Sequence, residues 1–151
     1  MAAAGSALAA VTVSGAVREP RTWTVPDLGA LPQHELDVVY TCRSTGPRSH
    51  RMRGPLLRDA LALAVPEFAG EDRKARLRYF VALLASDGHR AVLSWGEIDP
   101  EFGNGPIVLG LVRDGLALDL EGPHLAVPGD SCGARNVSGV VAIRLDAYSG
   151  Q

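Results

Sequence analysis

The chain has 151 residues, a length that suits one globular domain and allows a sizeable buried core. Hydrophobic residues make up 46% and charged residues 21% of the chain, which is the composition of an ordinary globular protein. The formal net charge is −2, so long-range attraction to nucleic acid or to an acidic membrane is not expected. No apolar run approaches the roughly 18 residues of a membrane helix. We therefore expect a soluble protein without a nucleic-acid partner or a membrane span.

The opening segment, MAAAGSALAA, is small and apolar and ends in a pattern similar to a signal-peptide cleavage site. It lacks a basic region, and its apolar stretch is short. We expect residues 1–10 to be a disordered end or the remnant of a leader, and residues 11–151 to form a single domain. The cytoplasm is the favoured compartment, and export is the alternative if a leader has been removed.

The first part of the domain alternates between strand and helix signals. Residues 11–17 alternate and are β-branched, which predicts a strand. Residues 24–27 give a helix start, with a threonine cap, a proline in the first turn and an aspartate at the capping-box position. Residues 36–41 predict a second strand, which ends at Cys42. Residues 55–64 have apolar side chains at helical spacing and predict a second helix.

The second part of the domain predicts mainly strands joined by hairpins. Residues 79–85 are apolar on both faces, as expected for a strand that is buried on two sides. Asp87-Gly88 predicts a hairpin turn back through residues 89–95. The remaining predicted strands span residues 107–112, 116–120 and 137–145. The pattern favours an α+β fold with a mixed, largely antiparallel sheet and a few short helices.

A cation-rich segment from Arg43 to Gly54 follows Cys42; it has no hydrophobic period and is predicted to be a loop. Its four arginines would favour the thiolate form of Cys42, which is the form that binds metals, and would attract an anionic cofactor or substrate. The residues alone leave a second interpretation open, namely a small buried cysteine beside a solvated arginine-rich loop. The other cysteine, Cys132, has no CxxC partner, so a structural zinc site is not expected, and the sequence does not decide whether it pairs with Cys42.

Seven short motifs follow one another in a recognisable order between residues 11 and 145. They are Val13-Ser14-Gly15-Ala16-Val17, Thr22–Leu28 (TWTVPDL), Tyr40-Thr41-Cys42, Gly54-Pro55-Leu56-Leu57, Ser86-Asp87-Gly88-His89, Arg113–Leu118 (RDGLAL), and Pro128-Gly129 followed by Gly133–Val137 (GARNV). In order and spacing they resemble the molybdopterin-binding domain of sulfite oxidase-type oxidoreductases. The resemblance covers nearly the whole chain.

The resemblance implies a molybdenum–molybdopterin cofactor and oxygen-atom transfer on a small oxyanion or oxide substrate. In that family a cysteine at the end of this strand binds molybdenum through sulfur, and Cys42 matches it. The family's Gly-Ala-Arg segment holds the pterin and its phosphate, and Gly133, Ala134 and Arg135 match it. Arg43 is expected to contribute to the same cofactor site.

Weaker candidates for binding a substrate or another anion are Arg48, Arg51, Arg53 and His124. Arginine suits this role because its planar, permanently charged guanidinium matches oxyanions. The chain contains no CxxCH haem motif, no flavin fingerprint and no nucleotide-binding glycine loop. Electrons are therefore expected to pass to a separate redox protein.

The sequence also departs from the family pattern near both site segments. The Gly-Asn-Arg-Arg run that usually follows the cysteine is replaced by Arg43-Ser44-Thr45-Gly46, and the Lys-Trp pair after Gly-Ala-Arg is replaced by Ser138-Gly139. A buried cofactor needs many polar partners, because unpaired polar groups are costly to desolvate. These changes leave open an alternative function: a cofactor-free binding or accessory module of the same fold, which binds a small anion or a protein partner.

Overall fold

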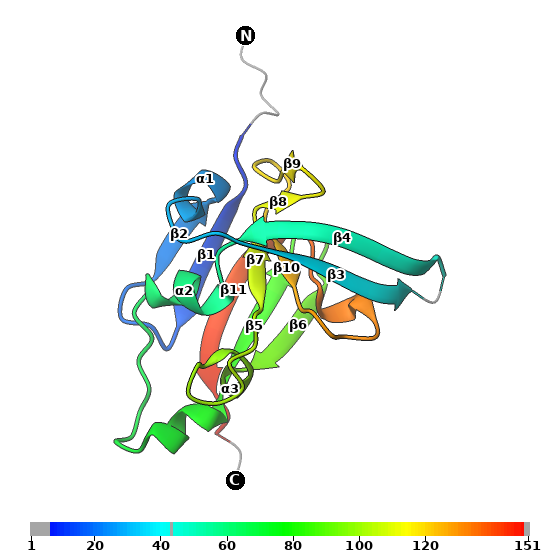
Figure 1. The fold of residues 1–151 in the computed structure, drawn as a ribbon. Coiled ribbons are helices and arrows are strands. Elements are labelled where there is room, and N and C mark those ends of the chain that lie inside the picture. Colours follow the sequence, from blue (N-terminus) through cyan, green and yellow to red (C-terminus); the bar gives the residue numbers. More distant parts are fainter. Residues whose placement is uncertain (1–6, 43, 150–151) are drawn as a thin grey trace.

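Three sheets and a few short helices make up the protein in a computed structural model, which describes residues 7–42 and 44–149, with Cys42 described through its backbone (Figure 1). The largest sheet has five strands in the order β2-β1-β11-β5-β6. The strand bounds are β1 (Ala10–Gly15), β2 (Arg21–Thr24), β5 (Tyr79–Ala85), β6 (Arg90–Ser94) and β11 (Val140–Ala147). The pair β1–β11 is parallel and the other pairs are antiparallel, so the prediction of a mixed, largely antiparallel α+β fold is confirmed.

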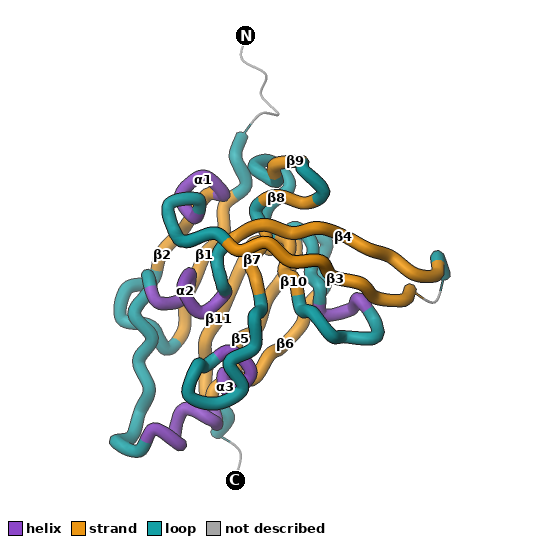
Figure 2. The backbone as a smooth tube through the Cα atoms, in the orientation of Figure 1, coloured by secondary structure: helices purple, strands orange, loops and turns teal. Residues whose placement is uncertain are grey.

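The two smaller sheets carry most of the predicted site residues. One has four strands in the order β3-β4-β8-β9, and the other pairs β7 with β10. Their strands are β3 (His34–Cys42), β4 (Gly46–Gly54), β7 (Val108–Gly110), β8 (Val112–Arg113), β9 (Leu116–Ala117) and β10 (His124–Ala126). Strands β3 and β4 form a long hairpin whose tip projects from the body of the molecule (Figures 1 and 2).

The helices are short. They are α1 (Val25–Leu28), α2 (Leu57–Ala62), α3 (Trp95–Ile98) and the 3-10 helices η1 (Arg73–Arg78) and η2 (Gly133–Arg135). The predicted capping box of α1 is confirmed, because the Asp27 amide donates to Thr24 Oγ1 and the Thr24 amide donates to the Asp27 carboxylate. No helix in the described part of the chain is long and apolar enough to span a membrane.

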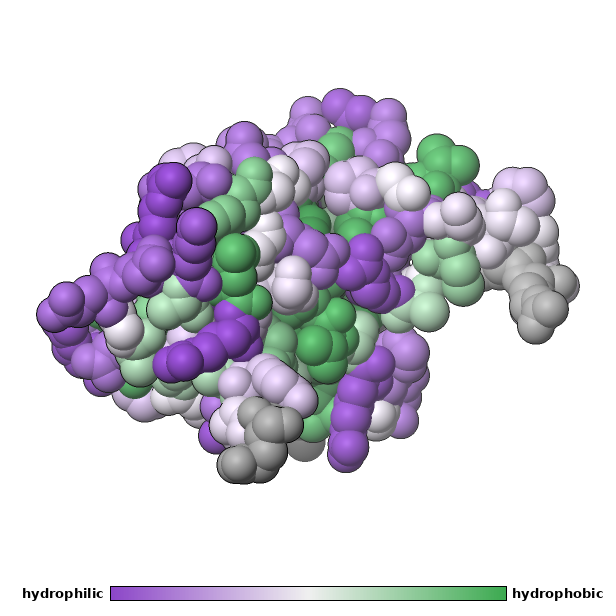
Figure 3. All heavy atoms as spheres, turned by 90° about the horizontal axis from the view of Figure 1, so that it is seen from below, coloured by the Kyte–Doolittle hydropathy of each residue, from purple (hydrophilic) through white to green (hydrophobic). Residues whose placement is uncertain are grey.

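The main core lies between the five-stranded sheet and the helices and small sheets in front of it (Figure 2). Val13, Val81 and Ile143 point into this core and are fully buried. Viewed from below, hydrophobic residues gather near the middle of the molecule between hydrophilic margins (Figure 3). The prediction that residues 79–85 are buried on both faces is wrong, because β5 alternates strictly between buried and partly exposed side chains. One face of this sheet is therefore open in the described chain.

The prediction of a loop between Arg43 and Gly54 is also wrong, because residues 46–54 form β4. Both faces of this strand are largely polar, so no hydrophobic period marked it. The strand is held instead by its full register with β3, and Met52, its only large apolar residue, is fully buried. Across the hairpin, Arg51 adds ion pairs to two acidic residues of β3.

Candidate functional site

The end of β3 meets the Gly-Ala-Arg segment at one corner of the fold. The Thr41 amide donates a 2.9 Å hydrogen bond to the carbonyl oxygen of Ser131. The backbone of Cys42, the last residue of β3, therefore lies beside the loop that leads into Gly133. We call this region, made of Tyr40–Cys42, Asp130–Asn136 and His124, the β3 corner. Two segments that are about 90 residues apart in the chain, and that the resemblance assigns to one cofactor, thus lie next to each other.

Gly133 and Ala134 are both used by the protein itself. A Cβ added at Gly133 would lie 2.5 Å from Cδ2 of Tyr40, so only glycine allows this ring to pack so closely on the loop. The carbonyl oxygen of Ala134 accepts a 2.7 Å hydrogen bond from Nε2 of His89, which follows the β5–β6 turn. These contacts hold the loop against β3 and against the residue that follows the β5–β6 turn, and so shape the corner.

Arg135 forms an internal clamp with two carboxylates. Its Nε and Nη2 each donate a 2.9 Å hydrogen bond to Asp130, and its Nη1 donates a 2.9 Å bond to Glu97 in α3. The Asp130 and Glu97 carboxylates raise the pKa of Arg135, and the Arg135 guanidinium lowers the pKa of Asp130. A phosphate contact from Arg135, as predicted from the resemblance, would therefore require a carboxylate to give way.

This clamp leads to a prediction for anion binding. Asp130→Asn removes one of the two negative charges on Arg135, so we expect phosphate to raise the thermal midpoint more in this variant than in the wild type. Thermal unfolding across a phosphate series measures the effect. Asp119→Asn removes the same charge away from the clamp and serves as the control; equal phosphate responses in the two variants would contradict the prediction.

His124 is a buried, neutral member of the corner. It is 4% exposed, its Nε2 donates to the Asn136 carbonyl at 3.1 Å, and its Nδ1 accepts from Nη1 of Arg113 at 3.1 Å. Burial, reinforced by the Arg113 charge, lowers the pKa of His124 to about 4. Arg113 in turn makes a two-pronged ion pair with Glu121. His124 is thus uncharged at neutral pH, and both of its ring nitrogens have protein partners.

His50 stands beside His124 but was not among the predicted site residues. Its Nδ1 donates to Asp114 at 2.7 Å, and its ring centroid lies 6.1 Å from that of His124 and 6.2 Å from that of Tyr40. Asp114 and Gly115 both have positive φ, which is the two-residue hairpin turn that the Asp-Gly pair predicts, and this turn delivers the carboxylate to His50. Recognising β4 as a strand would have placed His50 on the same face as Tyr40.

Asn136 carries an unpaired donor at the same corner and was also missed. The side chain is 7% exposed, and its Oδ1 accepts a 2.8 Å hydrogen bond from the Val127 amide, which determines the orientation of the carboxamide. Its Nδ2 has no hydrogen-bond partner among the described residues. Because buried donors are almost always paired, this atom marks a position for a water molecule or a ligand.

The arginines of the hairpin do not converge on this corner as one group. Arg48 lies opposite Tyr40 in the register of β3 and β4. Its guanidinium donates a 3.2 Å hydrogen bond to Thr45 Oγ1 and makes no ion pair with a described carboxylate. Arg51 and Arg53 alternate to the other face of β4, where Arg51 pairs with Asp37 and Glu35.

Arg43 and Cys132 are the last two residues that the sequence singles out. Arg43 lies outside the described residues. Cys132 is exposed, and its thiol is free. The described residues contain no cluster of three or more His, Cys, Asp or Glu side chains that could hold a metal ion.

Comparisons with known proteins identify the fold. No family model matches the sequence, and no curated protein matches it. The structure is similar to the crystal structure of the sulfane dehydrogenase SoxCD from Paracoccus pantotrophus, with a TM-score of 0.70 and 19% sequence identity. The match covers 94% of this chain and 38% of the SoxCD chain. At this identity the comparison establishes that nearly the whole chain shares its fold with one part of a dehydrogenase.

Proposed function

We propose that the chain is a relative of the sulfite oxidase-type molybdopterin domain and acts as a molybdopterin-binding oxidoreductase domain on a small oxyanion or oxide. The observation that carries this proposal is the β3 corner, where the Thr41–Ser131 hydrogen bond holds the strand end of Cys42 against the Gly-Ala-Arg segment. The fold shared with a sulfane dehydrogenase supports it.

One group in the corner and one beside it suit a polar, anionic cofactor. Among the described residues, Nδ2 of Asn136 is a buried donor with no hydrogen-bond partner, and Arg48, which lies opposite Tyr40 on the hairpin, has no carboxylate partner. Such groups lower the cost of burying pterin and phosphate atoms. Cys42 would provide the sulfur ligand, and Gly133 and Arg135 would contact the pterin and its phosphate once a carboxylate leaves Arg135. The bound cofactor would supply a molybdenum centre capable of oxygen-atom transfer, and a separate redox protein would take the electrons.

The residues around the corner have roles of their own in such a site. Asp114 accepts the Nδ1 proton of His50 in a hydrogen bond, which leaves Nε2 of His50 as the acceptor. Burial and the Arg113 charge keep His124 in its neutral form, and its hydrogen bonds to Arg113 and to the Asn136 carbonyl fix the orientation of the ring. These contacts place the half-buried His50 beside a neutral, rigidly held His124.

A second candidate function is a cofactor-free module that binds a small anion or a protein partner. The specific observation in its favour is the clamp, because Asp130 and Glu97 already neutralise the arginine that the family uses for phosphate. In this case Arg48 and Asn136 would be the groups left to bind a small anion.

Metal and pterin analysis separates the two functions. Protein from a host that makes molybdopterin is expected to carry close to one molybdenum per chain, and Cys42→Ser is expected to lose it. Cys132→Ser is the matched control, because it changes the other cysteine, which lies in the neighbouring loop, and should keep the metal. Molybdenum far below one per chain in the wild type, unchanged in Cys42→Ser, would reject the enzyme in favour of the binding module.

A further inference from the structure

Strand β5 has the sequence of a strand covered on both faces, but the described chain covers only one. Its outward side chains are Phe80, Ala82 and Leu84, all apolar and all partly exposed. Neither core cluster of the described residues includes them. Antiparallel sheets with a solvated face usually alternate apolar with polar residues, so an apolar outer row indicates a surface that something covers.

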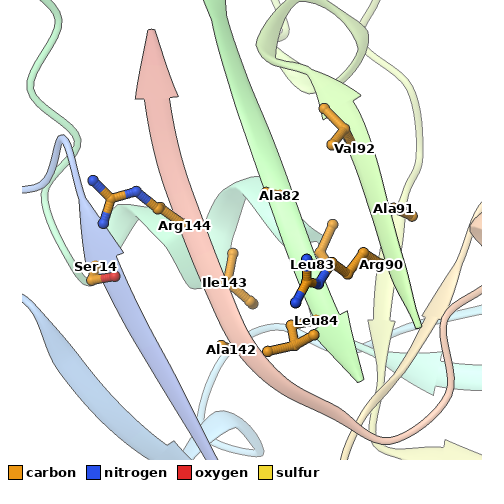
Figure 4. A pocket seen from close by; sticks show the side chains of 10 residues that line it. All are labelled: Ser14, Ala82, Leu83, Leu84, Arg90, Ala91, Val92, Ala142, Ile143 and Arg144. Carbon is orange, nitrogen blue, oxygen red and sulfur yellow. The ribbon is translucent and has the colours of Figure 1, made fainter. Parts of the chain in front are cut away.

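The outer face is hollowed at its centre. A cavity of about 340 Å³ lies over β11, β5 and β6, with Ala82, Leu84, Val92 and Ala142 among its lining residues (Figure 4). Val92 is 55% exposed. The strand registers place Ala142 opposite Leu84 and Ala82 opposite Val92, so small and large apolar side chains alternate across the hollow. An uneven apolar surface of this kind can pack closely against the side chains of a second apolar surface.

Two arginines border the hollow on either side of β5. Arg144 comes from β11 and Arg90 from β6, the two strands that flank β5 (Figure 4). The guanidinium of Arg90 makes no hydrogen bond or ion pair with any residue that the structure describes. Arg144 pairs with Asp146, but both side chains are about half exposed, so the pair is weak. An occupant with negative charge on both flanks would complement this border.

The distance between the two strands that carry these arginines is close to the diameter of an α-helix. Neighbouring strands lie about 4.8 Å apart, so β11 and β6 are separated by roughly 10 Å, close to the ~10–12 Å diameter of an α-helix with its side chains. Strand β5 has seven residues, which corresponds to roughly 23 Å, or about 15 residues of helix. A helix along β5 would cover the apolar row and place its flanks beside Arg90 and Arg144.

We propose that this face binds an amphipathic α-helix of a partner protein, with an apolar stripe along Phe80, Ala82 and Leu84 and acidic residues on both flanks. A second copy of this chain fits less well, because it would bring the same two arginines toward each other. The inference is independent of the proposed function, since the face lies on β5, β6 and β11 and uses no residue of the β3 corner.

A pair of matched peptides tests the inference by fluorescence anisotropy. Each is a helical 15-mer with leucine at helical spacing, one flanked by glutamate and the other by lysine. The wild-type protein is expected to bind the glutamate peptide, and the double substitution Arg90→Glu with Arg144→Glu is expected to weaken that binding at least about tenfold and to bind the lysine peptide instead. Ala82→Arg should block both peptides, whereas Val39→Arg, on the exposed face of the hairpin, should leave binding unchanged.

Several results would overturn the inference. One is equal binding of the glutamate peptide to the wild type and to the charge-reversed protein. Another is a wild-type dimer in sedimentation that Ala82→Arg converts to a monomer, because a second copy would then be the occupant. Binding of decanoate at this face without binding of either peptide would identify a small amphiphilic acid instead. Thermal midpoints of all variants establish that each is folded.

Discussion

The free energy of unfolding is expected to fall by about 2–3 kcal/mol between pH 6.5 and about pH 4.5 because of His124 alone. In the folded chain the pKa of His124 is lowered to about 4 from the ordinary 6.5. As the pH falls below 6.5, the unfolded chain binds a proton at this residue and the folded chain does not. Each pH unit in this window then lowers the free energy of unfolding by about 1.4 kcal/mol. The stability that neutral His124 contributes is complete above its pKa in the unfolded chain and is lost as the pH falls toward its pKa in the folded chain.

Urea unfolding at a series of pH values measures this slope. The carboxyl groups of Asp99 and Asp130 have lowered pKa values. The stability that these two groups contribute is therefore lost only below the pH range in which His124 acts. His124→Gln is expected to remove most of the slope, and His50→Gln, at the neighbouring half-buried histidine, is expected to keep it. A wild-type slope that survives in His124→Gln would show that the acid sensitivity comes from another group.

Gly133→Ala is expected to destabilise the fold by about 2–3 kcal/mol, the upper part of the usual range for overpacking. The new methyl group would overlap the Tyr40 ring, so either the ring or the loop must move. Urea unfolding measures the loss. In a Tyr40→Leu background the same change is expected to cost less than about 1 kcal/mol, because the overlapping ring atoms are gone. Equal costs in the two backgrounds would mean that the strain arises elsewhere in the loop.

The parts of the fold that follow from local chemistry were predictable. The Thr24–Asp27 capping box, the strand that ends at Cys42 and the Asp87-Gly88 hairpin each depend on neighbouring residues, and all three are present. The mixed sheet followed from the number of such hairpins. The meeting of Cys42 with the Gly-Ala-Arg segment was expected from the family resemblance, and the Thr41–Ser131 hydrogen bond agrees with it.

The parts that depend on partners distant in sequence were not predictable. Strand β4 is stabilised by pairing and by Arg51 with its acidic partners on β3, not by its own hydrophobic period. Glu97, one of the two carboxylates that hold Arg135, lies 38 residues away in another element. The one-sided exposure of β5 is also a property of the assembled sheet, since its sequence reads as a strand covered on both faces.

The parallel pairing of β1 with β11 has a consequence for how the protein is made. Strand β11 lies between β1 and β5, so it joins the opening hairpin of the domain to the hairpin of β5 and β6. Until Val140–Ala147 leaves the ribosome, those two hairpins have no strand between them, and the apolar side chains of Val13 and Val81 remain in water. The main core therefore closes only once β11 has been made, and until then the edges of these strands are open to pairing with other chains.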